Sequence, residues 1–306
     1  MNYRYSGHGT FPCRYTWLPK AVRHLCATPT LFADEDAAMV RLGVGKNMVR
    51  AIRFWVEATG VAVPAGNRTS EMTVTRFGRK VLEPDKGHDE FFEDDQTLWL
   101  VHWNLSTQQH PLFAWHTMLN YWNKPDFTRT EAAAFFEKEA QREEKQLSPV
   151  TLDEHLGIFL HTYVPTRSGK REVVEESLDC PLVELEFINE VGERTAGSGR
   201  REKIYTFRTG EKPEISPELF IYCLADFWSV RHSQERTLSF GQVAVGECSP
   251  GQVFKLPEQE IRERLDSIGR DSQGLFAYQE STAMQQVVMR GAPSHDALLR
   301  KIYREK

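Results

Sequence analysis

The spacing of apolar positions between residues 46 and 57 predicts an amphipathic helix. At about 100° per residue, one side of this helix is an apolar stripe. Its members are Met48, Ala51, Ile52, Trp55 and Val56. The opposite side carries Lys46, Arg50, Arg53 and Glu57. One face is therefore expected to pack on a core, while the other shows three cations.

The neighbouring segments predict a winged helix-turn-helix. Residues 34–42 form a helix before the turn, and residues 60–73 are rich in turn-forming residues, as expected of a wing. Gly43 and Gly45 are expected to give the intervening turn its freedom at positive φ. This fold can place its second helix in the major groove of DNA.

Two groups of residues are the predicted DNA contacts. The groove-facing group is Lys46, Asn47, Arg50 and Arg53, and the phosphate-facing group is Arg76, Arg79 and Lys80, after an expected N-cap at Thr75. Asparagine can pair bidentately with adenine and arginine with guanine. The competing interpretation is that these cations form a solvated helix face.

Further elements follow from the same patterns along the rest of the chain. Predicted helices cover residues 14–25, 97–105, 128–145, 148–162, 218–228 and 257–268, and predicted strands cover 182–188, 203–208, 275–279 and 285–289. Thr128 and Glu131 have the spacing of a capping box. The aromatic segment 91–123 is interpreted as core packing rather than as a base-stacking surface.

The predicted fold class is mainly α with small β-hairpins, that is, α+β. Residues 1–125 are expected to form a winged-helix DNA-binding domain with aromatic helical support, and residues 126–165 a helical connector. Residues 166–306 would hold a β-hairpin and a second, winged-helix-like unit whose exposed charges are mixed. Two basic loops, 167–171 and 195–201, accompany the first two predicted strands, and the second loop is interpreted as a hairpin tip rather than a phosphate-binding loop.

Composition places the chain among ordinary globular proteins, with 40% hydrophobic and 26% charged residues. It contains no apolar run of about eighteen residues and no signal-peptide core at its start, so a membrane span is not expected. Its five cysteines include no Cys-x-x-Cys pair, which favours reduced thiols and a cytoplasmic location.

The charge distribution is uneven along the chain. The formal net charge is −5, yet residues 1–80 hold 12 Lys+Arg against 5 Asp+Glu, a net of +7. Residues 81–155 hold 6 against 15, a net of −9. A basic segment on an acidic protein is typical of a local nucleic-acid contact, although it also suits an interface within the chain.

No established catalytic motif is present, and no metal site or cofactor is evident. Gly43-Val44-Gly45-Lys46-Asn47 lacks the spacing of a phosphate-binding P-loop. The acidic segment 89–95 is interpreted as matching a helix dipole rather than binding magnesium. His8, next to a basic segment with Arg14 and Lys20, is a candidate for acid–base chemistry at a phosphodiester; the alternative is that this exposed-looking start simply caps the fold.

Four sequence blocks resemble a bacterial family first catalogued as a domain of unknown function, the SspB-like family of the Ssp DNA phosphorothioation system. They are residues 5–20, 42–49, 97–103 and 249–256. The resemblance implies a DNA-nicking component used in antiphage defence, with divalent magnesium if it is a nickase. The implied partners are double-stranded DNA, a cysteine desulfurase, an ATPase and an ATP pyrophosphatase. Gly9 stands where the family usually has glutamate, so a catalytic role of that loop does not carry over.

Two other functions fit the same sequence. One is a non-enzymatic subunit for DNA site recognition or scaffolding, with catalysis supplied by partners. The other is a winged-helix transcription regulator.

Overall fold

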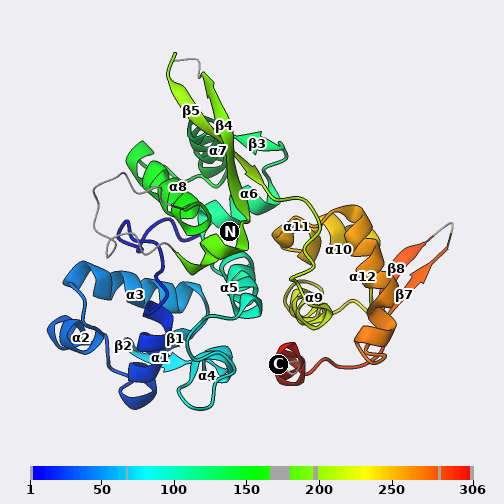
Figure 1. Ribbon diagram of the computed structural model, residues 1–306, viewed down its shortest axis with the longest axis horizontal. Helices are drawn as coiled ribbons and strands as arrows, with labels where there is room; N and C mark the ends of the chain where they lie inside the picture. Colours follow the sequence, from blue (N-terminus) through cyan, green and yellow to red (C-terminus); the bar gives the residue numbers. More distant parts are fainter. Residues whose placement is uncertain (1–2, 67, 166–179, 196–198, 282–283, 304–306) are drawn as a thin grey trace. The chain divides into compact units, whose positions relative to one another are not determined.

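The computed structural model describes residues 3–66, 68–165, 180–195, 199–281 and 284–303. These residues are mostly helical, and their named strands form small antiparallel sheets, so the predicted α+β class is confirmed. The chain divides into two compact units (Figure 1). Unit 1 comprises Met1–Met118 and Trp122–Arg208, and unit 2 comprises Leu119–Tyr121 and Thr209–Lys306.

Unit 1 begins with a group of helices and a hairpin, and continues with further helices and a second sheet (Figure 1). The first group is α1 (Trp17–Ala27), α2 (Glu35–Leu42), α3 (Lys46–Ala58), β1 (Ala62–Ala65), β2 (Arg68–Val74) and α4 (Arg76–Leu82). The rest is α5 (Asp95–Thr107), α6 (Phe113–Asn120), β3 (Asp126–Phe127), α7 (Arg129–Arg142), α8 (Pro149–Tyr163), η1 (Pro181–Leu185), β4 (Ile188–Thr195) and β5 (Arg201–Phe207).

Side-chain caps begin several of these helices, as their sequences indicate. Thr128 and Glu131 form the expected capping box at the start of α7. Thr75 accepts a hydrogen bond from the Gly78 N–H and so caps α4. Ser148 does the same for α8, where Pro149 at the first helical position has no N–H to satisfy.

Aromatic side chains form the core of unit 1. Trp99, Trp103 and Trp115 are fully buried. The indole N–H of Trp115 donates to the Tyr163 hydroxyl at 2.9 Å, and that hydroxyl also lies 2.7 Å from His102 Nδ1. The polar atoms of Trp115, Tyr163 and His102 thus meet one another inside the core. The interpretation of the aromatic segment as packing is confirmed for most of its rings, whereas Phe91 is 60% and Tyr121 39% exposed.

The sheet β3-β5-β4 is antiparallel, with β5 in the middle. The prediction of a strand at residues 182–188 was wrong, because residues 181–185 form the short helix η1. Pro181 begins that helix, and its buried Leu182 and Leu185 lie three residues apart on one side.

Domain breaks were expected after residues 125 and 165, whereas unit 1 runs to Arg208 with the short interruption Leu119–Tyr121. β3 pairs with β5, and this draws the predicted connector and the β4–β5 hairpin into unit 1. The expected functions of the three segments stay predictions. The loop 167–171 lies outside the described residues, as do residues 196–198 of the second loop.

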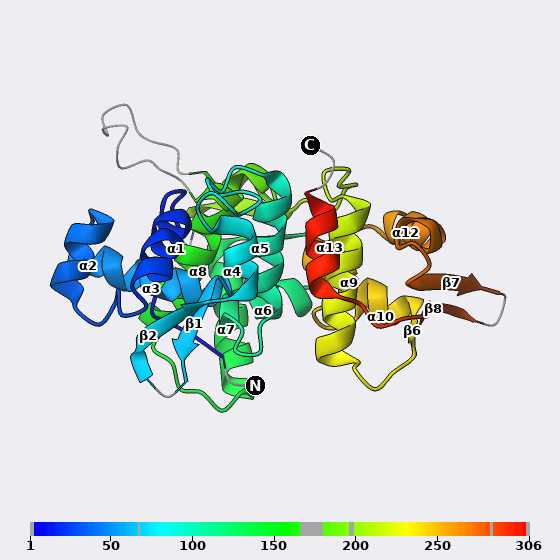
Figure 2. The same ribbon diagram turned by 90° about the horizontal axis from the view of Figure 1, so that it is seen from below.

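Unit 2 carries its own helices and a three-stranded sheet. Its elements are α9 (Pro217–Arg231), β6 (Thr237–Ser239), α10 (Phe240–Val245), α11 (Pro250–Phe254), α12 (Glu258–Asp271), β7 (Phe276–Glu280), β8 (Gln285–Met289) and α13 (His295–Ile302). The sheet order is β6-β8-β7. Helices α9 and α13 lie side by side (Figure 2). The Trp228 ring stacks on Phe276, with centroids 5.7 Å apart, inside the core.

Within the described part of the chain, no helix is both long and apolar enough to cross a membrane.

Candidate nucleic-acid interface

The turn between α2 and α3 depends on one glycine. Gly43 ends α2 at φ 67°, a left-handed conformation that glycine adopts without strain, and its N–H donates to the Met39 carbonyl at 2.9 Å. Gly45 precedes α3 at φ −73° and ψ 163°. The expectation that both glycines need positive φ was therefore wrong for Gly45, whose extended conformation is open to other residues.

The apolar side of α3 is buried as the sequence predicts, with one shift. Ile52, Trp55 and Val56 are fully buried, and the Trp55 indole N–H donates to the Phe11 carbonyl at 2.9 Å. Val49 is buried, whereas Met48 is only partly covered. The core contacts α3 over a wider arc than a single stripe, because α1 and β1 both pack against it.

The opposite side of α3 is open. Side chains of Lys46 and Arg50 are 53% and 59% exposed, and Asn47 is exposed between them. Arg53, one turn further on, is half-buried. Three of the four predicted groove-facing residues are therefore accessible in the first turns of the helix, where recognition helices contact base edges.

A carboxylate of α2 contacts two of these cations. Glu35 lies 2.9 Å from Lys46 Nζ, and it accepts hydrogen bonds from Arg50 Nε at 2.6 Å and Nη2 at 3.1 Å. Hydrogen bonds from Arg50 and Lys46 lower the pKa of Glu35 to about 2, so its carboxylate is charged at neutral pH. The turn thus brings one anion against the basic face of α3.

The predicted phosphate contacts lie on α4, after the hairpin rather than in it. Arg76 is exposed, Arg79 is 48% exposed and Lys80 is half-buried. Arg79 Nη1 lies 3.6 Å from a carboxylate oxygen of Glu83, one turn along the helix. Packing holds α4 close to the hairpin, since a Cβ on Gly78 would lie only 2.2 Å from the Val61 carbonyl oxygen.

His8 is buried, so the expectation of an exposed start was wrong. Its side chain is 3% exposed, and its Nε2 lies 3.2 Å from Nδ1 of His155 in α8, with the two rings stacked. Burial lowers the pKa of His8 to about 4 and that of His155 to about 3. Both rings are therefore neutral at physiological pH.

The other two catalytic candidates do not join His8. Arg14 lies over the Trp17 ring at 5.5 Å and is half-buried, and Lys20 is exposed on α1. Among the described residues, no hydrogen bond or ion pair links either side chain to His8. Gly9 itself sits beside α3, where a Cβ would lie 3.9 Å from the Asn47 carbonyl oxygen.

The acidic segment before α5 serves the backbone. Asp89 accepts hydrogen bonds from the N–H groups of Glu93 at 2.9 Å and Asp94 at 3.0 Å. Asp94 caps α5 through the Gln96 N–H at 2.9 Å. The interpretation of this segment as a helix-start feature is confirmed.

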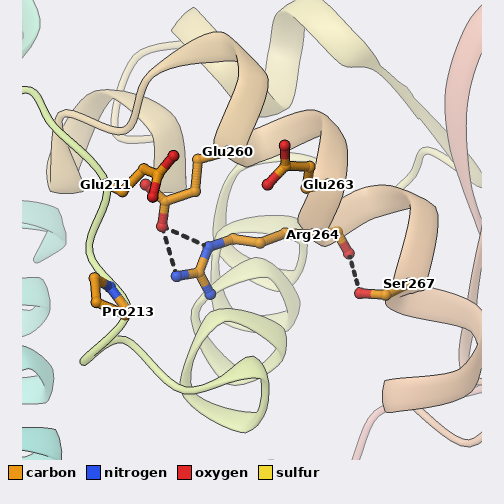
Figure 3. A pocket seen from close by; sticks show the side chains of 6 residues that line it. All are labelled: Glu211, Pro213, Glu260, Glu263, Arg264 and Ser267. Atoms are coloured by element: carbon orange, nitrogen blue, oxygen red, sulfur yellow. Dashed lines mark hydrogen bonds and ion pairs between the residues drawn. The ribbon is translucent and has the colours of Figure 1, made fainter.

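A hollow of about 270 Å³ on unit 2 is lined by residues of α12 and of the segment before α9 (Figure 3). Arg264 donates to Glu260 through Nε at 3.0 Å and Nη2 at 2.7 Å, and to the Ile215 and Lys212 carbonyls. Its guanidinium therefore makes four hydrogen bonds inside the unit. Exposed Glu211 and Glu263 line the same hollow, so its surface is acidic.

Comparisons with known proteins identify the fold and the family. Two solved structures have this fold, "Magnesium ion-bound SspB crystal structure" and "SspB crystal structure". They are 24% and 23% identical to this chain; each has a TM-score of 0.82, with 98% of this chain and 88% of the other covered. No curated protein matches the sequence. The model of the family "Protein of unknown function (DUF4007)" matches residues 5–303, and the chain belongs to that family.

Proposed function

We propose that this protein is the DNA-binding component of a DNA phosphorothioation system. In this proposal, α1, α2, α3 and the β1–β2 hairpin form a winged helix-turn-helix, and α3 enters the major groove. The exposure of Lys46, Asn47 and Arg50 at the start of a helix whose other side is buried carries the proposal. These side chains offer donors that suit base edges and phosphates.

The link to phosphorothioation comes from the resemblance of the four sequence blocks and from the fold shared with SspB. As its partners we propose double-stranded DNA together with a cysteine desulfurase, an ATPase and an ATP pyrophosphatase. Arg76, Arg79 and Lys80 of α4 are the proposed phosphate contacts in this arrangement, since α4 directly follows the hairpin.

We further propose that the protein nicks one DNA strand. His8 does not fit the role of a general acid or base for this step, because its ring is buried against His155. In the segment around Asp89, both oxygens of Asp89 accept backbone hydrogen bonds, so this carboxylate serves the start of α5. This observation favours a second candidate function, DNA recognition or scaffolding without catalysis.

Charge reversal on α3 tests the DNA contact. Arg50→Glu, alone and with Arg53→Glu, is expected to weaken binding to a random duplex about tenfold or more, measured by fluorescence anisotropy. Arg270→Glu with Arg300→Glu, the same change of charge on unit 2, is the matched control. Circular dichroism checks that each variant is folded. Wild-type affinity in a folded Arg50→Glu variant would remove α3 from the interface.

Plasmid relaxation separates the two candidate functions. Purified protein, with and without Mg²⁺, is incubated with supercoiled plasmid and the products are resolved on a gel. Conversion to the open-circular form supports nicking. Duplex binding without relaxation supports the recognition subunit and contradicts intrinsic nicking.

A further inference from the structure

Glu35 is the residue of α2 that contacts the exposed face of α3. Its two carboxylate oxygens are divided between Arg50 Nε and Nη2, at 2.6 and 3.1 Å, and Lys46 Nζ, at 2.9 Å. Asp34, the preceding residue, caps α2 by accepting from the N–H groups of Asp36 and Ala37. The cap fixes the start of α2, and the Gly43 turn fixes α3 beside it.

We propose that Glu35 acts as a built-in counterion that sets how tightly α3 holds DNA of random sequence. The carboxylate occupies the positions at which phosphate oxygens would meet Lys46 and Arg50. The inference rests on the proposed function and names the residue that regulates that same surface.

The physical basis is competition between two anions. Phosphates are the main sequence-independent ligands of a random duplex, and each contact gains affinity because a Lys or Arg releases small counterions that are condensed on the DNA. Lys46 and Arg50 already have a carboxylate, so DNA must displace Glu35 or tolerate its repulsion. Exposed ion pairs of this kind are weak, which allows displacement at a modest loss of affinity.

A base edge changes this balance. Arginine gains a bidentate pair with guanine, and a carboxylate can accept from the amino group of cytosine. Glu35 can therefore stay beside Arg50 at a suitable G·C pair, whereas a phosphate gives it no donor. Glu35 therefore weakens binding to DNA of random sequence but does not prevent contacts to the edges of particular base pairs.

The test compares two neighbouring acids of α2. Glu35→Gln keeps the size of the side chain and removes its charge. Asp36→Asn removes the same charge one residue along, from an exposed side chain that contacts neither Lys46 nor Arg50. Dissociation constants for a random duplex are measured for wild type and both variants by fluorescence anisotropy over a series of salt concentrations.

Glu35→Gln is expected to bind the random duplex about three- to tenfold tighter than wild type, with a steeper salt dependence by about one unit of slope. Asp36→Asn is expected to change the affinity less than about twofold. Equal affinities for the two variants, or weaker binding by Glu35→Gln, would overturn the inference.

The result is distinguishable from failure of the proposed function. If Arg50→Glu binds like wild type, α3 is not the interface and both proposals fall. If Arg50→Glu loses binding while Glu35→Gln matches Asp36→Asn, only the counterion role falls. In the Arg50→Glu background, Glu35→Gln is expected to increase duplex affinity less than it does in the wild-type protein. Of the two cations that Glu35 contacts, only Lys46 is left in that background.

Discussion

Acidification to about pH 5 is expected to destabilise unit 1 through its buried histidine pair. His8 and His155 have pKa values lowered by burial from 6.5 to about 4 and about 3. In the unfolded chain both rings bind protons as pH falls through 6.5, whereas the folded state stays neutral until about pH 4. The stability present at neutral pH is therefore lost progressively between these two values.

The loss of the free energy of unfolding follows from the difference between the pKa of histidine in the unfolded chain and the pH. Each pKa unit corresponds to about 1.4 kcal/mol, so at about pH 5 each histidine costs about 2 kcal/mol. The pair lowers the free energy of unfolding by about 4 kcal/mol relative to pH 7.5, a large fraction of the stability of a typical domain.

Urea titrations followed by tryptophan fluorescence measure this loss. Six of the seven tryptophans belong to unit 1, so the signal reports mainly on that unit. His155→Phe keeps a ring against His8 and removes one titrating group, so its pH-dependent loss is expected to fall to about half. His110→Phe, which removes an exposed histidine of the same unit, is the control and is expected to behave like wild type.

A free energy of unfolding that is flat between pH 7.5 and pH 5 would refute the reasoning. So would an unchanged pH dependence in His155→Phe. The first result would mean that the two rings accept protons in the folded state as readily as in the unfolded chain, and the second that His155 does not contribute to the loss.

Two further predictions concern packing and the role of unit 2. Gly78→Ala is expected to cost about 1–3 kcal/mol in urea titrations, because the new Cβ would meet the Val61 carbonyl oxygen at 2.2 Å; wild-type stability would contradict this close approach. Arg262→Gln in α12 is expected to leave duplex affinity unchanged in anisotropy titrations, since Arg262 pairs with Glu258 at 3.2 Å and Glu280 at 2.7 Å. A tenfold loss would place α12 in the DNA interface.

Local patterns in the sequence determined where most helices lie. The apolar spacing of residues 48–56 predicts α3, and Thr128 with Glu131 marks the start of α7, since both signals act between residues a few positions apart. Weaker local signals were missed. Ser239 and Gln242 form a capping box at the start of α10 and could have located that helix.

The exposed positions of α3 were also readable from the sequence, because a helix with one buried side must show the other. Lys46, Asn47 and Arg50 are exposed as its periodicity predicts. The same pattern gives no information on which anion stands opposite these cations, since Glu35 belongs to another helix. Their DNA-binding role stays a prediction.

Only the tertiary structure decided the surroundings of individual groups. His8 lies against His155, 147 residues along the chain, and β3 pairs with a strand whose sequence is about 80 residues away. Such contacts depend on how whole helices and strands pack. The local sequence around a residue does not predict which distant residue will bury it. The periodicity of apolar residues therefore predicted which face of a helix is buried. The packing of the elements decided which charges and rings that face contacts.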